Sequence, residues 1–480
     1  MDLTRRALLA SLAAAGLAGR ARADGRPVRR QAGPEGLEAI FARSGLAQKS
    51  GFCLVDLADG RVIEAHRADI AFPPASVTKI VTTLYALDAL GPDYRFATRL
   101  VAGAAPAGGR LEGDLLLVGG GDPVLDTDQL GDLIGGIGRL TVSGGLKLAT
   151  GALPAIAFID PDQPDGAGYN PGIGGLNLNF NRVFLQWSPG KAGPQIAFRA
   201  PGERFSVDVP TVSGALADGV RAPRRAEADS DALWLLPPLA GTGSLWLPVR
   251  APGPYAGQVI RALAAEDGTA LPAAEIVGGA DGLAGGPVLG EHLSDPSLDL
   301  MRGMLFHSTN LTAEVLGLRA SQVRGAAPVD LAGSAATMTE WARGRFGLLP
   351  SARFVNHSGL SDRTRLTPAE QIRVLSHDPD RLAGLLRTRT IADGAGGTFQ
   401  ADGVQLVCKT GTLDFVSALA GYLEGPGPRR LAFAIFAADP EARAAISEEE
   451  RANPPGAKAW AGRARGQQAA LLRRWIALEG

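Results

Sequence analysis

The stretch that most constrains how this chain of 480 residues can fold is the apolar run at residues 80–90, which directly follows Pro73-Pro74-Ala75-Ser76-Val77-Thr78-Lys79. Two adjacent prolines disfavour helical backbone before them, so they end an extended segment. An almost wholly apolar run after them is typical of a helix that is buried on all sides. The pattern predicts a buried helix with Ser76 in its first turn.

Ser76 and Lys79 are three residues apart, so on a helix they project from the same face, about one turn from each other. A hydroxyl is a weak nucleophile until a base takes its proton. Burial lowers the pKa of a lysine, which lets the neutral amine act as that base. Backbone N–H groups at a helix start lack partners and suit an oxyanion. The pair predicts a serine nucleophile that forms an acyl-enzyme.

A capping serine beside a surface lysine would produce the same Ser-x-x-Lys pattern, and that alternative is common. The lysine content favours the catalytic interpretation. Only six of the 48 basic residues are lysines, and the rest are arginines. An arginine stays protonated and cannot act as a base. A lysine where a base is needed is therefore informative.

The composition is that of an ordinary globular protein, and a net charge of −1 argues against a nucleic-acid partner. At the N-terminus, Arg5-Arg6 precede an apolar run at residues 7–18, and Ala21-Arg22-Ala23 offers a cleavage site. This predicts a bacterial secretory signal peptide at residues 1–23, which resembles a twin-arginine signal but leaves the export route open. The run is too short to span a bilayer. We expect a periplasmic protein with no membrane span in its mature form.

Two cysteines, Cys53 and Cys408, could form a disulfide in an oxidising compartment. Both lie in apolar, strand-like segments, where buried unpaired thiols are common, so both alternatives stay open. The five histidines are scattered without the spacing of metal ligands. We predict neither a metal site nor a cofactor.

The remaining periodicities predict a mixed α/β fold in which short strands, broken by glycine and proline turns, fill residues 98–290. Further strands are predicted at residues 51–57, 61–67, 403–411, 416–423 and 430–438. One helix is expected across residues 298–321, and others at 330–346 and 367–386. The chain ends in an amphipathic helix that we expect to pack onto the sheet. Its predicted apolar face comprises Trp460, Ala464, Leu471, Trp475 and Leu478.

Three short motifs follow one another along the chain. They are Ser76-x-x-Lys79, Ser308-Thr309-Asn310 and Lys409-Thr410-Gly411-Thr412. This ordered set, with its third member on a strand followed by another strand, is typical of penicillin-binding proteins and serine β-lactamases. The set is far more specific than any of its members alone.

The chain resembles the D-alanyl-D-alanine carboxypeptidase/endopeptidase family of the penicillin-binding protein 4 type (class C low-molecular-mass, peptidase family S13). Besides the three motifs, the resemblance depends on Gly113-Asp114, Gly119-Gly120-Gly121-Asp122-Pro123, Leu178-Asn179-Phe180-Asn181, Ala313-Glu314, Ser358-Gly359-Leu360-Ser361 and Ser417-Ala418-Leu419-Ala420-Gly421-Tyr422. It covers essentially the whole mature chain. One departure is Asn356-His357, where the family commonly has Asp-Gly.

The resemblance implies an α/β fold, with a β-lactamase/transpeptidase-like core made of an antiparallel sheet flanked by helices. One or two mainly β domains would be inserted into this core. After the signal peptide, it implies a first core part at residues 24–98, an inserted region at 99–290 and a second core part at 291–480.

The resemblance also implies the catalytic roles. Ser76 would attack the carbonyl of the penultimate D-alanine, with Lys79 as the base. Ser308 would relay protons to the leaving amine, and Asn310 would bind the substrate amide and hold Lys79. Lys409 would supply a positive field. The expected substrates are peptidoglycan peptides, with β-lactam antibiotics as covalent inhibitors.

The third motif would bind the substrate through Thr410, Gly411 and Thr412. The hydroxyls of the two threonines would hold the terminal carboxylate. The N–H groups of Ser76 and Thr412 would form the oxyanion hole.

Two other functions share parts of this pattern. A serine β-lactamase uses the same motifs, but its Glu-x-x-Leu-Asn signature is absent, since Ile173 stands where the glutamate would precede Leu176-Asn177. No tyrosine begins the Tyr-x-Asn signature of the other β-lactamase class. A catalytically silent peptidoglycan-binding module would have no reason to retain all five catalytic residues. The sequence therefore favours a carboxypeptidase.

Overall fold

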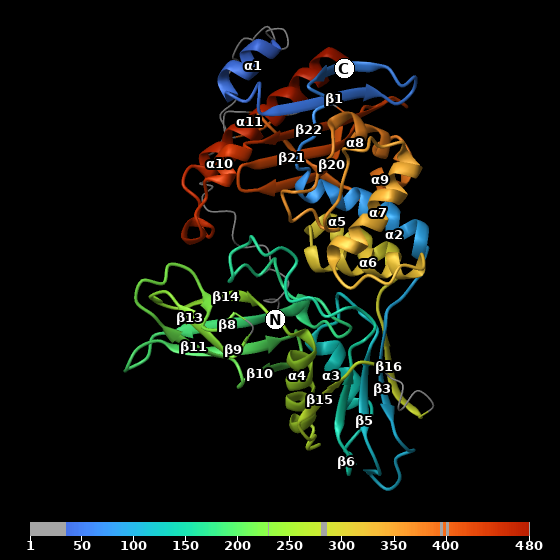
Figure 1. Ribbon diagram of the computed structural model, residues 1–480, viewed down its shortest axis with the longest axis vertical. Helices are drawn as coiled ribbons and strands as arrows, with labels where there is room; N and C mark the ends of the chain where they lie inside the picture. The colour runs from blue at the N-terminus through green and yellow to red at the C-terminus, as the bar shows by residue number, and fades with distance from the viewer. Residues whose placement is uncertain (1–34, 229, 280–285, 394–396, 400–402, 480) are drawn as a thin grey trace, which may run out of the picture.

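The computed structural model describes residues 35–228, 230–279, 286–393, 397–399 and 403–479. The predicted signal peptide at residues 1–23 lies outside these ranges. The molecule is elongated, with an α/β core at one end and a mainly β region extending from it (Figure 1). None of the helices in the described part combines the length and the hydropathy needed to cross a membrane.

The core is built on a six-stranded sheet with the strand order β17-β20-β21-β22-β1-β2, and all neighbouring strands are antiparallel. Its strands are β1 (Ser50–Asp56), β2 (Val62–His66), β17 (Arg387–Arg389), β20 (Gln405–Leu413), β21 (Val416–Glu424) and β22 (Arg430–Ala438). The N-terminal hairpin β1–β2 thus joins a C-terminal meander, with Phe52 opposite Ile435. A separate short pair consists of β18 (Ile391–Ala392) and β19 (Thr398–Phe399).

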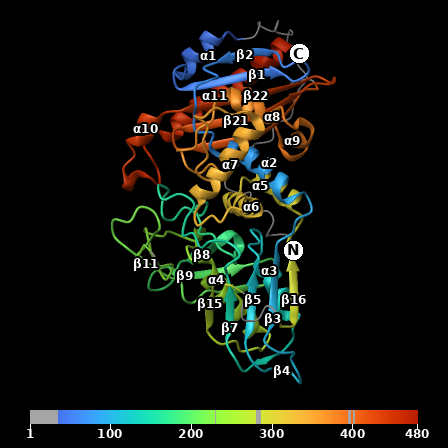
Figure 2. The same ribbon diagram turned by 45° about the vertical axis from the view of Figure 1, so that its right-hand side comes forward.

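Helices cover both faces of the core sheet (Figure 2). One face packs against α1 (Leu37–Ser44) and α11 (Ala457–Glu479). The other faces a larger apolar cluster that includes η2 (Ala75–Val77), α2 (Thr78–Leu90), α5 (Ser297–His307), α6 (Asn310–Val323), α7 (Leu331–Phe346), α8 (Pro368–Leu375) and α9 (Pro379–Leu385). The short α10 (Pro440–Ala444) and η4 (Glu448–Glu450) follow β22. Nine of the thirteen residues of α2 are buried, as its apolar sequence predicted.

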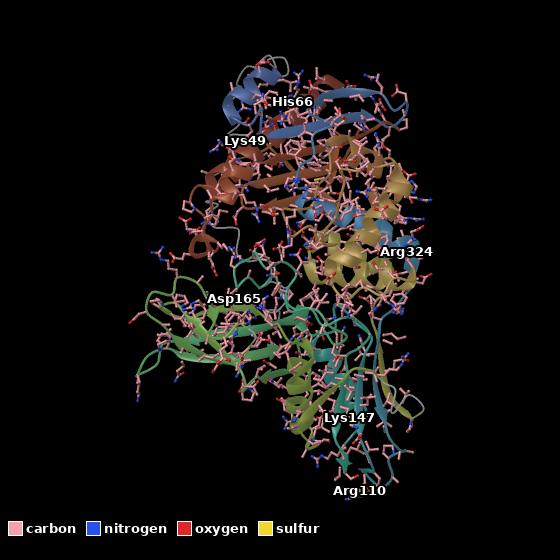
Figure 3. The ribbon with its side chains drawn as sticks, viewed as in Figure 1. Lys49, His66, Arg110, Lys147, Asp165 and Arg324 are labelled. Carbon is pink, nitrogen blue, oxygen red and sulfur yellow. The ribbon has the colours of Figure 1, made fainter. Side chains whose placement is uncertain are left out.

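The second region leaves and re-enters the core through adjacent strands. Strand β3 (Ala97–Ala102) begins opposite the end of β16 (Val288–Leu293), with Ala97 paired to Leu293. Between them lie β4 (Arg110–Leu111), β5 (Leu115–Gly119), α3 (Thr127–Gly135), β6 (Thr141–Val142), β7 (Leu146–Ala149), η3 (Asn179–Asn181), β8 (Arg182–Ser188), β9 (Gln195–Pro201), β10 (Ser206–Asp208), β11 (Ser213–Leu216), β12 (Arg224–Arg225), β13 (Leu233–Leu236), β14 (Gly243–Pro248), α4 (Pro252–Glu266) and β15 (Ala274–Val277). Arg110 and Lys147 lie at the end farthest from the core (Figure 3).

These strands form a five-stranded sheet in the order β15-β7-β5-β3-β16 and a four-stranded sheet in the order β10-β9-β8-β14. A three-stranded sheet has the order β11-β13-β12. Side chains from the larger sheets share one apolar cluster with α3 and α4. The architecture is therefore the predicted one, an antiparallel core sheet between helices with an inserted mainly β region.

The prediction of one helix across residues 298–321 is wrong. Helix α5 ends at His307, and α6 begins at Asn310. Between them, Ser308 adopts the left-handed conformation (φ 62°, ψ 34°). A right-handed helix cannot continue through a residue in this conformation. The apolar pattern runs through both helices because both pack against the same core, so periodicity did not reveal the break. The helix predicted at residues 367–386 is likewise divided, since Pro379 begins α9.

Cys53 and Cys408 are free, buried thiols on β1 and β20. Burial raises the pKa of Cys53 to about 11 and that of Cys408 to about 12. Both side chains therefore act as small apolar groups within the core.

Helix α11 uses only part of its predicted apolar face. Trp460, Ala464, Leu471 and Trp475 are buried, but Leu478 is 45% exposed near the helix end. Trp475 packs its ring against Phe52 and Phe433, with centroids 5.7 and 6.0 Å away, and its Nε1 donates to Glu64 Oε2 (2.8 Å). The expectation for Leu478 is wrong because the last turn of α11 extends beyond the side chains that bury the other four.

We expect Trp475→Ala to lower the free energy of unfolding by about 3–5 kcal/mol, because it removes a fully buried aromatic ring and leaves a cavity. The matched change Leu478→Ala, one turn later on the same helix, should change it by less than about 0.5 kcal/mol. Equilibrium urea denaturation measures both. Equal effects of the two changes would contradict the packing described here.

Candidate active site

Ser76 lies in η2, one turn of 3₁₀ helix that leads into α2. The residue before it, Ala75, is fully buried and has a φ of 45°, a left-handed conformation that is strained for a residue with a Cβ atom. The surrounding core holds this turn in place, and Ser76 itself is partly exposed. A strained turn of this kind presents the hydroxyl at the surface of an otherwise buried segment.

Lys79 follows one turn later and is fully buried. Its Nζ donates to Ser76 Oγ (3.0 Å), to Asn310 Oδ1 (2.8 Å) and to the carbonyl oxygen of Ser358 (2.7 Å). Burial holds the pKa of the Lys79 amine well below its usual 10.5, and the nearby charge of Lys409 lowers it further. The carboxyl of Glu314 acts in the opposite direction. When this amine is neutral, it no longer donates to Ser76 Oγ, and its lone pair can accept the proton of that hydroxyl.

The break between α5 and α6 positions the second motif. The left-handed Ser308 directs its hydroxyl toward Lys409, whose Nζ donates to Ser308 Oγ (2.8 Å). Asn310 begins α6, accepts from Lys79 and donates through Nδ2 to the carbonyl oxygen of Tyr169 (2.9 Å). A continuous helix could not place Ser308 and Asn310 against two different lysines in this way.

The third motif lies on β20. Lys409 is buried and also donates to the carbonyl oxygen of Thr410 (2.8 Å). Burial, together with the neighbouring charge of Arg389, lowers the pKa of Lys409 to about 7. Thr412 is exposed on the same strand. The strand thus presents hydroxyl groups and a cation that is only partly protonated at neutral pH.

Gly411 lets β20 approach the turn that carries Ser76. A Cβ atom at this position would lie 2.6 Å from the carbonyl oxygen of Pro74 and 2.9 Å from the backbone nitrogen of Ser76. Both distances are too short for any side chain. The glycine of the third motif is therefore a requirement for contact between the strand and the nucleophile turn.

The structure thus brings all five predicted catalytic residues into two adjacent hydrogen-bonded groups. Ser76, Lys79 and Asn310 form one group, and Ser308 and Lys409 form the other. In the described part of the chain, no cluster of three or more His, Cys, Asp or Glu side chains is arranged to hold a metal ion.

Sequence reasoning assigned no role to Glu314, which is fully buried on α6. Its two carboxylate oxygens accept from the backbone N–H groups of His357 and Ser358, both at 2.8 Å. These contacts fix the loop so that the Ser358 carbonyl meets Lys79. Glu314 stands four residues after Asn310, on the same helix face, and that spacing was the available signal.

The loop beside the site packs through His357, for which the sequence suggested no role. Its ring lies against α6 at Gly317, where a Cβ atom would be 2.1 Å from the ring. The ring Nε2 is 2.8 Å from Ser334 Oγ. Complete burial lowers the pKa of His357 to about 3, so the ring is neutral. His357 thus anchors the loop as a buried neutral side chain.

The inserted region also contributes to the site. Residues 156–173 form a closed loop, since Ile156 and Ile173 pair with each other. Tyr169 of this loop supplies the carbonyl that accepts from Asn310, and its own side chain is 51% exposed. Asp165 of the same loop lies on the side of the inserted region that faces the core (Figure 3). The loop therefore links the inserted region directly to the second motif.

The profile of the D-Ala-D-Ala carboxypeptidase 3 (S13) family matches residues 35–453. The chain belongs to this family. It is a serine-type peptidase and hence a hydrolase, as the sequence predicted.

Curated relatives span most of the chain. A D-alanyl-D-alanine carboxypeptidase of Actinomadura sp. is 28% identical over 447 residues, which is 84% of this chain and 80% of the relative. The D-alanyl-D-alanine carboxypeptidase DacB of Haemophilus influenzae is 24% identical over 427 residues, which is 80% of this chain and 84% of the relative.

Among solved structures, penicillin binding protein 4 from Haemophilus influenzae superposes with a TM-score of 0.67 at 21% sequence identity. The match covers 86% of this chain and 97% of that chain. At this identity the likeness shows the fold alone, and it confirms the predicted S13-type core with inserted β structure.

We expect Gly411→Ala to lower kcat/KM for D-alanine release about 10- to 100-fold, because the added methyl group must push β20 away from the Ser76 turn. Gly425→Ala is the matched control, since a Cβ there meets nothing within 4 Å. Release of D-alanine from a D-Ala-D-Ala peptide measures both. An unchanged rate in Gly411→Ala would show that the close approach is not required.

Proposed function

We propose that this S13 enzyme cleaves the terminal D-alanine from peptidoglycan stem peptides through an acyl-enzyme on Ser76. The observation that carries the proposal is the fully buried Lys79 amine, 3.0 Å from the Ser76 hydroxyl. A buried amine of lowered pKa beside a partly exposed serine is the arrangement that nucleophilic catalysis requires. No other described lysine has its Nζ hydrogen-bonded to the hydroxyl of a residue on the same helical turn.

In the acylation step, Ser76 Oγ forms a bond to the carbonyl carbon of the penultimate D-alanine. The hydroxyl proton passes to the neutral Lys79 amine, and the C–N bond to the terminal D-alanine breaks. Ser308 relays a proton from the protonated lysine side to the departing amine, so the terminal D-alanine leaves and Lys79 is neutral again. Water then attacks the ester, its oxygen forms the new carboxylic acid, and its proton passes by way of Lys79 to Ser76 as the acid product leaves.

The developing oxyanion would be held by the backbone N–H groups of Ser76 and Thr412. Support comes from the close packing of Gly411 on the Ser76 turn, which keeps the two segments together. Lys409 and the hydroxyls of Thr410 and Thr412 would bind the terminal carboxylate. Asn310 would bind the substrate amide while it holds Lys79.

The same carboxylate and acyl positions exist in β-lactam antibiotics, so we infer that these compounds acylate Ser76. The names of the relatives support a substrate that ends in D-alanyl-D-alanine. We also propose D,D-endopeptidase activity on cross-linked peptides and a periplasmic location after removal of residues 1–23. In this proposal residues 24–98 and 291–480 form the catalytic core, and residues 99–290 form the insertion.

Intact mass spectrometry of the mature protein after addition of benzylpenicillin tests the nucleophile. We expect a persistent adduct of one drug molecule in the wild type and none in Ser76→Ala. An adduct that disappears within seconds while penicillin is consumed would instead indicate a β-lactamase. A wild type without any adduct would overturn the catalytic proposal and favour a binding module.

The two lysines predict a bell-shaped pH dependence of kcat/KM. At low pH the rate falls because Lys79 becomes protonated and can no longer act as the base. As the pH rises through about 7, the rate falls again because Lys409 loses the charge that attracts the carboxylate. In the substrate complex the bound carboxylate favours charged Lys409, so the upper limb of kcat should lie at higher pH than that of kcat/KM. A kcat/KM that stays constant through pH 7 would contradict this role of Lys409.

A further inference from the structure

Arg389 is the last residue of β17, the short strand that pairs with the beginning of β20. The two strands are antiparallel, with Arg387 opposite Cys408 and Arg389 opposite Leu406, so the third motif begins just beyond the Arg387 end of the pairing. The side chain of Arg389 reaches back toward that motif, and its Nη2 lies 3.5 Å from Thr410 Oγ1. Its charge is also the largest electrostatic influence that lowers the pKa of Lys409.

Within the described residues, this half-buried guanidinium has no carboxylate partner, and its Nε is closed off from solvent without a hydrogen bond. Two other arginines illustrate the contrast, since Arg225 contacts Asp165 and Asp231, and Arg474 contacts Glu64. Leaving a guanidinium half-buried and unpaired is unfavourable. Arg389 is nevertheless an uncompensated cation among the described residues, which suggests that the missing negative charge comes from a ligand.

The preceding arginine of the same strand has a different environment. Arg387 stacks its guanidinium over the ring of Phe306, 4.4 Å from the ring centroid. This contact satisfies Arg387 through a cation–π interaction near the end of α5. The two arginines of β17 therefore differ in that only Arg389 reaches the hydroxyl of the third motif.

We infer that Arg389 binds the α-carboxylate of the leaving D-amino acid, together with Thr410. The inference rests on the proposed function, because it concerns the same site. Since Nε is enclosed, the Nη groups beside Thr410 Oγ1 would make the contact. A planar guanidinium suits a carboxylate and forms short, charge-assisted hydrogen bonds with it.

Arg389 supplies what Lys409 cannot. With a pKa of about 7, Lys409 is charged in only part of the molecules near neutral pH. A guanidinium keeps its charge throughout this range. Arg389 thus provides a constant positive charge for the carboxylate and makes the enzyme selective for substrates whose residue after the cleaved bond carries a free carboxylate.

The test compares two substrates, an N-acylated peptide ending in D-Ala-D-Ala and the same peptide with a C-terminal amide. We expect Arg389→Gln to lower kcat/KM for the acid about 10- to 100-fold, mainly through KM, because a charge-assisted contact is lost. The value for the amide should change less than about threefold, since the amide never had this contact. Arg389→Lys should restore part of the preference for the acid.

Arg387→Gln is the matched control on the same strand, and it should leave the ratio of acid to amide unchanged. If Arg389 had a merely structural role, Arg389→Gln would lower kcat/KM equally for the acid and for the amide substrate. An acid-to-amide ratio in Arg389→Gln equal to that of the wild type would overturn the inference while Ser76 acylation still supported the proposed function. Thermal unfolding shows whether Arg389→Gln folds. If it does not fold, Arg389→Lys takes its place. An acid-to-amide ratio of kcat/KM in Arg389→Lys equal to that of the wild type would then overturn the inference, and a reduced ratio would support it. A wild type that benzylpenicillin does not acylate would overturn the proposed function itself.

Discussion

The amine of Lys79 has three acceptors, and they come from three segments that are far apart in the chain. Ser76 precedes it by one turn, Asn310 begins α6, and the carbonyl of Ser358 lies in a loop after α7. A fully buried amine is tolerated only where such partners exist, because an unsatisfied buried polar group costs about 1–3 kcal/mol. The convergence of the three segments therefore removes this cost from the folded state. Glu314 completes this arrangement by holding the backbone of the third segment.

The balance of charge around this lysine explains what the site can bind. The charge of Lys409 acts on Lys79, the charge of Arg389 acts on Lys409, and Glu314 is the buried carboxyl whose charge acts on Lys79. Burial lowers the pKa of both lysines, the charge of Lys409 lowers that of Lys79 further, and the charge of Arg389 lowers that of Lys409 further. In the proposed function, this excess of positive charge would be compensated when a substrate places its carboxylate and its developing oxyanion among these groups.

Much of the core was predictable because its signals are local. The alternation of residues 416–423 and 430–438 and the turn between them specify a hairpin, and the apolar run after Lys79 specifies a buried helix. Other features were not predictable in this way. The left-handed Ser308 interrupts a pattern that looks like one helix, since an apolar face is equally required of two helices packed on the same core. Leu478 continues the apolar stripe of α11 but passes the edge of the cluster it was expected to join.

The sequence by itself determined the three motifs, their order and their chemistry, because a serine, a lysine and a Lys-Thr-Gly strand have few other uses in this combination. Only the tertiary structure decided that Lys79 contacts Asn310, that Glu314 holds the loop and that Arg389 lies beside Thr410. These contacts join residues separated by 21 to 231 positions. Local patterns indicate whether a residue is buried or exposed, but they do not identify its distant partner. The motifs therefore predicted the type of chemistry, and the fold decided which residues contact one another at the site.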